Sequence, residues 1–541
     1  MDSVVSGGWM LRLVPVAALL LALTGPVAAQ TVPGERRPPP VPGASGEIVR
    51  PPAAPARPPA ESSQAIKFEV NEFRFAYNTL FDTATLAELV KDYLHRPLTV
   101  AELNSAADRI TDWYVHQGYS LAVAFVPVQT LKNGVVRIEI FEGRISSLLA
   151  LSQMYDPRKL ERALLPLEKG RVYRASEMEG GLLRLNDLPG LHARALLSPG
   201  AEIGQSRVLV QTAEQRWNAQ ATVDSYGHKS LGRVRTAAGG AVNNPFGASD
   251  HIQLMAVRST TGGLLYGFFG YDAGLFSPEL RERISYGEAR YTLSGALEGI
   301  KGRSRSATLA VDWTPVRSRA QQWTLSSGFN RVQSNTTFEG IPLPFDEAYN
   351  LIELSTRYIA SPGSGAPLVA ALTLASSGRK PDAGQADSVG LRAELDVQSH
   401  LEFAGHWNLY GRVDGVFSPD PLPTSAQFSI GGPYSVRGFP PGDRRGDRGF
   451  LGSLGFGYSG GQRLHWGTRI FADTGKATAA KPAPGDKNET LVSAGLGAGA
   501  AMGFGSVQCS LTVDLAKPVG SVKASDGSDD PQLFALLSVA Y

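Results

Sequence analysis

Residues 507–516, V-Q-C-S-L-T-V-D-L-A, alternate apolar and polar side chains without a break. A period of two is typical of a β-strand, whose successive side chains point to opposite faces. The segment also has the roughly 9–11 residues of a transmembrane β-strand, with lipid on one face and a barrel lumen on the other. We therefore expect Val507, Leu511 and Leu515 to face lipid and Asp514 to face the lumen. Cys509 then lies on the lipid side as a small apolar residue.

Similar segments follow one another from Trp217 to the end of the chain. The clearest are residues 233–242, 253–258, 284–293, 307–312, 323–332, 351–358, 391–397, 407–417 and 464–473. Counting every candidate gives roughly sixteen strands, an even number as bacterial barrels require. The chain ends on Leu537, Val539 and Tyr541, an alternation that resembles the C-terminal signal read by the outer-membrane assembly machinery. A soluble β-sandwich is the alternative, but it rarely needs so many strands separated by glycine. The sequence thus predicts a mainly β protein with a membrane barrel over residues 215–541.

The start of the chain reads as an export signal. An apolar run from Leu13 to Leu23 precedes the small residues Val27-Ala28-Ala29, which predicts a signal peptide at residues 1–29. A membrane anchor is the alternative, but the run is shorter than the roughly 20 residues that cross a bilayer. Residues 30–63 are a Pro-rich linker, for which a spacer is favoured over a polyproline ligand. The 52 basic and 50 acidic residues give no sign of nucleic-acid binding, and one cysteine excludes an intrachain disulfide.

Two α+β units follow, at residues 64–143 and 144–214. In the first, Thr85 with Glu88 and Thr99 with Glu102 have the spacing of capping boxes that open two helices. The second predicted helix has its apolar face at Leu103, Ala106, Ala107, Ile110 and Tyr114, and Gly118 can end it. Asn133-Gly134 predicts a hairpin turn. The order is β-α-α-β-β, and it repeats more weakly in the second unit, where Ser176 with Glu179 again suggests a cap.

This order resembles POTRA domains. The similarity rests on Gly118-Tyr119 after the second helix and on Phe141-Glu142-Gly143 at the end of the last strand. The resemblance implies periplasmic domains that receive an unfolded client by pairing an added strand along a sheet edge. Two small α+β domains without a client are the alternative.

One stretch interrupts the strand pattern: residues 428–450, FSIGGPYSVRGFPPGDRRGDRGF, which show no helix or strand period. If the first strand rises from the periplasm, even-to-odd connections are short periplasmic turns, such as residues 459–461 and 503–506. The stretch then follows the eleventh strand and starts from the outside. We expect an inserted loop at residues 418–449, the sixth external loop, folded back into the lumen.

Within this framework the chain resembles two-partner-secretion transporters, the TpsB class of ShlB/FhaC/HecB type, which are related to the barrel-assembly protein BamA. The most specific similarities are the loop motif Val436-Arg437-Gly438-Phe439 and the barrel motif Phe471-Ala472-Asp473-Thr474-Gly475. The first predicted periplasmic turn, Asn244-Pro245-Phe246-Gly247 with Asp250, also matches. Two features depart from the family: Ser453-Leu454 stands where a Glu-Leu pair is expected, and residues 30–63 show no amphipathic period for the plug helix that family members often have before the linker.

The resemblance implies an outer-membrane transporter that exports a TpsA-type exoprotein, an adhesin or haemolysin, without ATP. It also implies a monomeric barrel surrounded by outer-membrane lipids and built by the assembly machinery. It assigns Arg437 to Asp473, whose carboxylate can accept a bidentate bond from a guanidinium. Gly438 would allow a sharp turn, Phe439 could pack on the inner wall, and a water-filled lumen would screen the ion pair. A solvated arginine and an unrelated strand aspartate are the alternative.

Other function classes find less support. A barrel-assembly factor normally carries more periplasmic repeats than two, and a passive porin needs neither client-binding domains nor the loop motif. Matches to G-x-S-x-G and G-x-G-x-x-G within residues 455–461 lack the helix that each motif requires, so we expect no enzyme and no catalytic residues. Arg445-Gly446-Asp447 is more readily a polar contact than an adhesion tripeptide. The histidines show no metal-ligand spacing, so neither a metal nor a cofactor is expected.

Overall fold

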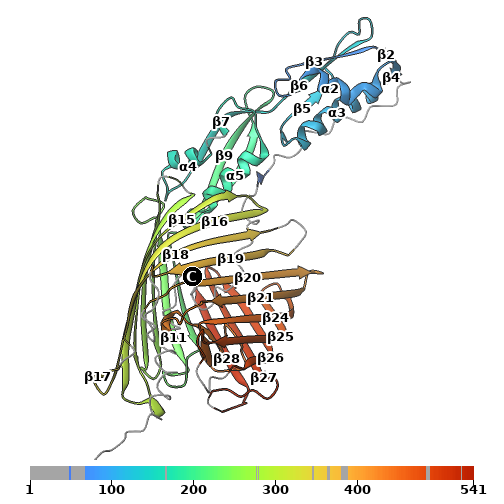
Figure 1. Cartoon of the computed structure of the whole chain (residues 1–541). Coiled ribbons are helices and arrows are strands. Elements are labelled where there is room, and N and C mark those ends of the chain that lie inside the picture. The colour runs from blue at the N-terminus through green and yellow to red at the C-terminus, as the bar shows by residue number, and fades with distance from the viewer. Residues whose placement is uncertain are drawn as a thin grey trace, which may run out of the picture. The chain divides into compact units, whose positions relative to one another are not determined.

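The computed structural model describes residues 48–49, 67–164, 167–275, 277, 279–343, 346–361, 366–378, 388–482, 488–525 and 527–541. One compact unit is formed by Ala44–Glu214, and the other includes Gln215–Tyr541 (Figure 1). The predicted signal peptide lies outside the described residues, as does the predicted linker apart from Ile48–Val49. Among the helices within the described ranges, none is both long and apolar enough to cross a membrane.

The first α+β domain has the predicted β-α-α-β-β order, with one additional short ladder. Its elements are β2 (Phe68–Val70), β3 (Glu72–Ala76), α2 (Thr83–Val90), η2 (Lys91–Tyr93), β4 (Arg96–Leu98), α3 (Val100–His116), β5 (Val123–Phe125) and β6 (Val135–Phe141). The main sheet has the order β3-β6-β5, with β3 parallel and β5 antiparallel to β6, while β2 pairs with β4. The five predicted apolar positions of α3 are all buried, so its amphipathic pattern places α3 against this sheet.

Of the three predicted helix caps, one is confirmed. At the start of α3, Thr99 and Glu102 form both hydrogen bonds of the capping box. The predicted box of Thr85 with Glu88 is wrong, because α2 begins earlier and its N-cap is Asp82, whose carboxylate accepts from the Thr85 N–H at 2.7 Å. The predicted cap at Ser176 is also wrong, because α5 (Ala175–Asn186) already includes it. The spacing S/T-x-x-E alone therefore does not locate a helix start.

Glu142 ties the end of β6 to the loop that precedes α2. Its carboxylate accepts hydrogen bonds from the N–H groups of Thr79 and Leu80, at 2.6 and 2.7 Å, and from the Tyr114 hydroxyl at 3.2 Å. The following Gly143 has a φ of 69°, and a Cβ there would lie 2.5 Å from the Leu121 side chain. The Phe-Glu-Gly sequence thus combines a buried acceptor with a left-handed residue in a tight space.

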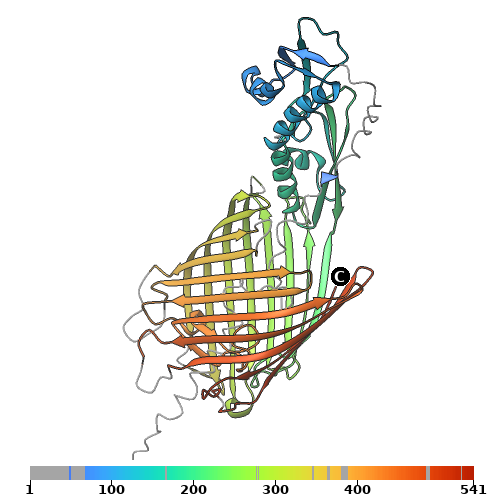
Figure 2. The same ribbon diagram turned by 90° about the vertical axis from the view of Figure 1, so that its right-hand side faces the viewer.

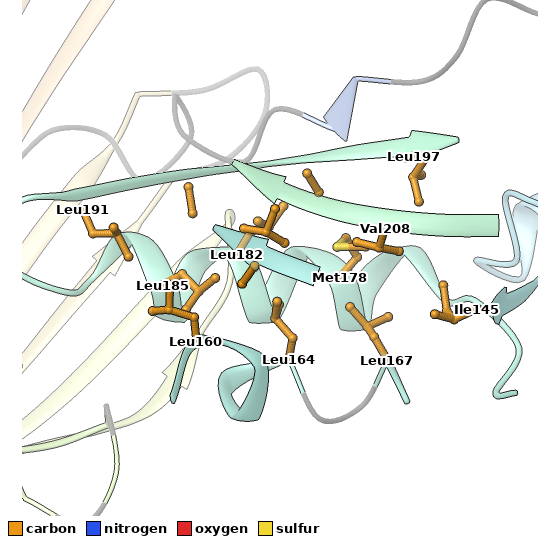
Figure 3. Close-up of a cluster of buried hydrophobic side chains, with 14 of the residues drawn as sticks. Ile145, Leu160, Leu164, Leu167, Met178, Leu182, Leu185, Leu191, Leu197 and Val208 are labelled. Carbon is orange, nitrogen blue, oxygen red and sulfur yellow. The ribbon is translucent and has the colours of Figure 1, made fainter. Parts of the chain in front are cut away.

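The second α+β domain consists of β7 (Arg144–Leu151), α4 (Pro157–Ala163), α5, β8 (Leu191–Pro199) and β9 (Gln205–Glu214). Its sheet has the order β1-β8-β9-β7, and leucines of α4 and α5 pack beneath it (Figure 3). Strand β1 (Ile48–Val49) lies inside the predicted linker and pairs in parallel with Ala195 and Leu196 of β8. The expectation that the linker is only a spacer is therefore wrong at these two residues.

The rest of the chain closes into an antiparallel barrel of sixteen wall strands, with the short β17 (Ile341–Pro342) added to β16. The sixteen wall strands are β10 (Trp217–Asp224), β11 (Arg235–Asn243), β12 (His251–Ser259), β13 (Leu264–Gly274), β14 (Leu280–Thr292), β15 (Ile300–Arg317), β16 (Gln321–Phe338), β18 (Glu347–Ala360), β19 (Leu368–Ser376), β20 (Arg392–Phe403), β21 (Trp407–Phe417), β24 (Arg448–Gly460), β25 (Leu464–Thr478), β26 (Thr490–Phe504), β27 (Val507–Pro518) and β28 (Gln532–Ala540). The predicted count and strand parity are confirmed. Figure 2 shows the steep tilt of the wall strands.

The two-residue pattern decides which side chains face outward. On β27, Leu511 and Leu515 are exposed on the outer wall while Asp514 is buried inside. The barrel closes where β28 pairs with β10, and there the Tyr541 ring stacks on Trp217 with the centroids 4.5 Å apart. At the turn after β11, Asp250 accepts hydrogen bonds from the N–H groups of Phe246 and Ala248. The carboxylate of Asp250 therefore fixes this short turn.

The capping box of α3 predicts a pH-dependent stability. The Thr99 backbone N–H, followed by the Arg96 guanidinium, lowers the pKa of Glu102 from 4.5 to about 2. A carboxylate whose pKa is lower in the folded state stabilises the fold above its unfolded pKa, and this is lost as the pH falls toward the folded pKa. In Glu102→Gln, hydrogen exchange of α3 amides should be faster than in the unmodified chain at pH 6, and the difference should shrink steadily as the pH falls from about 4.5 to about 2.

Asp108→Asn, further along the same helix, is the matched control and should show no such convergence. Equal exchange of Glu102→Gln and the unmodified chain at pH 6 would contradict the prediction.

Candidate functional site

The inserted loop between β21 and β24 is a long hairpin that returns on itself. It contains η5 (Thr424–Ala426) and two short antiparallel strands, β22 (Phe428–Ile430) and β23 (Arg444–Gly446). The expectation of a stretch without strands is wrong at β22 and β23. Between them, Gly431, Gly432 and Gly442 have φ values of 103°, 96° and 71°, which side chains disfavour. These glycines turn the chain so that residues 436–439 form its tip.

At this tip, Arg437 binds Asp473 on the inner wall of β25. The guanidinium donates two hydrogen bonds, from Nε to Oδ2 at 2.8 Å and from Nη2 to Oδ1 at 2.7 Å. The backbone N–H of Arg437 donates a third, to Oδ2 at 3.1 Å. A bidentate pair with an additional main-chain bond fixes orientation as well as distance. The loop tip is therefore held in a defined position against the wall.

Two serines flank Asp473 across the neighbouring strands. Ser453 of β24 and Ser493 of β26 are both directly opposite Asp473 in the strand registers. The Ser453 hydroxyl donates to Asp473 at 2.7 Å and accepts from Arg437 Nη2 at 3.2 Å. Tyr410 of β21 accepts a further bond from Nη2 at 3.0 Å. Ser453, the departure from the family pattern, thus joins both partners of the ion pair, where a glutamate would add a second carboxylate beside Asp473.

The guanidinium also lies on an aromatic ring and near a second carboxylate. Its Cζ is 3.2 Å from the centroid of the Phe471 ring, as in a cation–π contact. Arg437 Nη1 is 3.8 Å from Asp514 Oδ2, and Asp514 accepts from Arg469 Nη2 at 2.6 Å. Asp514, predicted to face the lumen, therefore meets the ion pair together with Phe471 and Arg469 of β25.

The ion pair is buried, and the expectation that lumen water screens it is wrong. Asp473 is 2% exposed and Arg437 is 7% exposed, because the loop, Phe471 and the flanking strands enclose them. Removing one partner of a buried pair leaves an uncompensated charge and typically costs about 3–5 kcal/mol. Loss of one partner of this contact consequently costs more free energy than loss of one partner of an exposed surface salt bridge.

Glycine and apolar residues shape the space around the tip. A Cβ on Gly438 would lie 2.5 Å from Ser493 Cβ and 2.7 Å from the Lys517 carbonyl carbon. The predicted sharp turn is present, since the Phe439 N–H donates to the Val436 carbonyl at 3.1 Å. Gly438 does not have a positive φ in this turn, so close approach to the wall is the reason for glycine. A Cβ on Gly475 would lie 3.0 Å from Val436, which is fully buried together with Phe439. Phe439 packs in a cluster with Ile430, Leu451, Ala477, Leu491 and Ala524.

The base of the same hairpin is anchored to the last two external loops. Asp443 accepts from the Ser525 N–H and hydroxyl, both at 2.8 Å, and Arg444 Nη2 donates to Glu489 at 3.2 Å. Asp447 accepts from the N–H groups of Leu422 and Ala480, both at 2.8 Å. Asp447 of the Arg-Gly-Asp sequence is thus a buried polar contact, and the sequence analysis did not find the partners of Asp443 or Arg444.

A lumen cavity of about 650 Å³ adjoins the loop tip. Its walls include Tyr410, Tyr434, Tyr458, His400, His465 and Arg412. Within the described parts of the chain, no group of three or more His, Cys, Asp or Glu side chains is arranged to hold a metal ion. The cavity lies between the loop and the strands of the inner wall, and tyrosine, histidine and arginine side chains line part of it.

A sixteen-stranded barrel with an inserted loop locked to its inner wall, preceded by tandem α+β domains, defines the class of outer-membrane transport proteins with periplasmic domains. Residues 204–502 match the family of haemolysin secretion/activation proteins ShlB/FhaC/HecB, and residues 68–143 match the ShlB-type POTRA domain. The chain belongs to this haemolysin secretion/activation family. It is accordingly an outer-membrane protein, and the POTRA domains are periplasmic in this family.

Several known proteins are similar to this chain in sequence or in fold. The heme/hemopexin transporter protein HuxB of Haemophilus influenzae is 24% identical over 418 residues, which is 72% of each chain. The hemolysin transporter protein ShlB of Serratia marcescens is 24% identical, covering 64% of this chain and 65% of that protein. CdiB from Escherichia coli has the same fold, with a TM-score of 0.68 and 20% identity over 90% of this chain and 92% of that one. BamA from Haemophilus ducreyi also shares it, with a TM-score of 0.53, 13% identity and coverages of 88% and 100%.

The steric constraint at Gly438 predicts a displaced loop in Gly438→Ala. Since the new Cβ would meet wall backbone at less than 3 Å, the tip must retreat and expose Arg437. Trypsin treatment of the folded barrel, with cleavage after residue 437 followed by mass spectrometry, should show cleavage in the variant and protection in the unmodified chain.

Gly415→Ala is a suitable control, because a Cβ there would lie 3.8 Å from the nearest atom. Continued protection of residue 437 in Gly438→Ala would show that the wall accommodates the methyl group.

Proposed function

We propose that the chain exports an unfolded exoprotein across the outer membrane, receiving it at the POTRA domains and passing it through the barrel without ATP. Folding of the client outside supplies the driving force. The client is a TpsA-type adhesin or haemolysin, consistent with the names of the haemolysin and hemopexin transporters to which the chain is similar. On this proposal the chain is not an enzyme and its barrel is a monomer.

The observation that carries the proposal is the locked loop tip. A loop that fills part of the lumen and binds the wall through Arg437 and Asp473 would obstruct free diffusion, which a passive porin requires. Its contacts, the ion pair and the apolar packing of Val436 and Phe439, are all noncovalent, so the loop can move when a client enters. The pair thus holds the loop in its secretion-competent resting position.

Client recognition is assigned to the β5 edge of the first POTRA sheet. Strand β5 lies at one edge of the order β3-β6-β5, where the Ala124 N–H and C=O bond the Thr111 hydroxyl of α3 instead of a further strand, so a client strand would replace these side-chain bonds. An extended client segment can add a strand there through main-chain hydrogen bonds, which need no specific client sequence. Val123, half-exposed on β5, offers an apolar contact beside that edge.

A barrel-assembly factor is the second candidate, and the fold shared with BamA favours it. The two candidates differ in their client. A transporter releases a soluble or surface-bound exoprotein outside, whereas an assembly factor leaves new barrels in the membrane. A large secreted protein encoded by the adjacent gene would support the transporter.

The proposal predicts that Arg437→Ala and Asp473→Ala each abolish most secretion. Each variant leaves one charge buried without its partner, so the loop leaves its position. The exoprotein encoded beside this chain is co-expressed, and its amount in the medium is measured relative to the amount of transporter in the outer membrane. The double variant should secrete no less than either single variant, because the two residues act as one unit.

Arg463→Ala, in an exposed periplasmic turn, controls for loss of one positive charge. Barrel insertion is checked by heat-dependent gel migration. Normal export by both single variants would refute the role of the pair.

A further inference from the structure

The outer surface of the barrel carries a compact group of arginines on β14, β15 and β16. Arg290, Arg303 and Arg305 all surround one carboxylate, that of Glu288. The N–O distances are 2.8 Å from Arg290, 2.6 Å from Arg303 and 3.4 Å from Arg305. On β16, Arg331 donates to Asn350 of β18 at 3.2 Å. We call these five charged residues the outer arginine cluster.

The alternation of the strands shows that this cluster faces outward. On β14, Glu288 and Arg290 lie an even number of residues from the exposed Ile284 and Tyr286, so all four point to the same face. The side chains on the opposite face are buried inside: Ser285, Gly287, Ala289 and Tyr291. On β15, Arg303 and Arg305 point to the same face as the exposed Leu309 and Trp313, because even numbers of residues separate them. The registers agree, since Arg290 is paired with Arg303 and Glu288 with Arg305. The arginines therefore belong to the face that contacts lipid.

Strand geometry gives the height of the cluster above the periplasmic side. A strand tilted by roughly 40° climbs about 2.5 Å per residue along the membrane normal. Outward-facing tryptophans mark the periplasmic ends of β15 and β16, at Trp313 and Trp323. Arg305 lies eight residues above Trp313, and Arg331 lies eight residues above Trp323. Both are thus about 20 Å higher, and Arg303 about 25 Å higher, near the outer limit of a lipid belt about 25 Å tall.

The arginines lie toward the external ends of β15 and β16. Strand β15 is the sixth wall strand, so it runs from the outside toward the periplasm, and β16 returns to the outside. There β16 pairs with the short β17 (Figure 1). The arginines consequently lie at the level of the headgroups of the outer leaflet, where lipid phosphates are found. Arginine on the lipid face is costly at the bilayer centre and is tolerated near the interface.

The cluster has an excess of positive charge. The cluster contains four guanidinium groups and one carboxylate, that of Glu288, which contacts three of them. Arg331 contacts only the Asn350 amide, so three positive charges have no protein anion among the contacts of the cluster. The outward faces of β18, β19, β20, β21, β26 and β28 carry no charged side chain in the parts described. Strands β24, β25 and β27 carry one each, at their outer ends. The concentration of charge on β14–β16 is therefore local.

We propose that the outer arginine cluster binds the phosphate groups of a phosphorylated lipid of the outer leaflet. Arginine suits this role because its planar guanidinium presents two parallel N–H donors to two phosphate oxygens. Glu288 holds the three neighbouring guanidinium groups side by side, and the ligand would bind their Nη groups, since Nε of Arg303 and of Arg305 is buried. The exposed Ile284, Tyr286 and Leu309 directly below offer an apolar surface for the acyl chains. The site would attach this side of the wall to the leaflet.

The test compares a diphosphorylated glucosamine-disaccharide lipid with the same lipid after removal of its phosphates. Purified full-length protein in detergent is titrated with each lipid, and bound lipid is counted by native mass spectrometry. The unmodified protein should retain the phosphorylated lipid at least about tenfold more strongly, and Arg303→Gln/Arg305→Gln should lose that preference, since two charged hydrogen-bond donors are gone. Arg303→Lys/Arg305→Lys should give an intermediate preference, because charge is kept and bidentate geometry is lost.

Arg319→Gln/Arg463→Gln is the matched control. It also removes two positive charges, but from periplasmic turns on the opposite leaflet side, and it should keep the full preference. Heat-dependent gel migration confirms that each variant is folded. Equal retention of both lipids by the unmodified protein, or an unchanged preference in the double glutamine variant, would overturn the proposal. So would complete displacement of the lipid by millimolar inorganic phosphate, which would indicate a site for free phosphate instead.

Discussion

Burial of the ion pair between Arg437 and Asp473 is the constraint on which the arrangement of the lumen depends. Two opposite charges removed from water are stable only when each remaining donor and acceptor has a partner. The wall supplies these partners from neighbouring strands, with Tyr410, Ser453 and Ser493 around the pair. Their positions follow from strand register, so the barrel must close correctly before the loop can bind. The pair therefore specifies where the loop lies more than it adds to the stability of the barrel.

The loop is held at two levels by different chemistry. Its tip depends on a charge pair and on the absence of a side chain at Gly438 and Gly475, which lets the backbone approach the wall. Its base depends on Asp443, Arg444 and Asp447, which bind backbone and side chains of the neighbouring external loops. Releasing the tip alone would leave the base attached. A client passing through the lumen would then displace the tip while the base keeps the hairpin in register.

Much of the fold could be predicted because the apolar residues recur with the period of a strand or of a helix in the elements concerned. The alternation over residues 507–516 and the apolar face of α3 led directly to the barrel and the first POTRA domain. The errors arose where local spacing competes with geometry: Thr85 and Ser176 have cap-like spacing but lie inside helices. The pairing of Arg437 with Asp473 could be predicted because both residues lie in motifs that match the family. Ser453 and Ser493 could not be found in this way, because only the strand registers place them opposite Asp473. Burial of the pair likewise depends on the packed hairpin, which has no sequence period.

A distance measurement between the loop and the wall shows whether the ion pair fixes the loop. Spin labels at Tyr434→Cys in the loop and Gln462→Cys in a periplasmic turn, in a Cys509→Ser background, report the loop position by pulsed electron resonance. With Asp473 present we expect one narrow distance distribution. With Asp473→Asn, which removes the charge but keeps the shape, we expect a broad distribution with a displaced loop. The same narrow distribution in both proteins would contradict the claim that this ion pair fixes the loop.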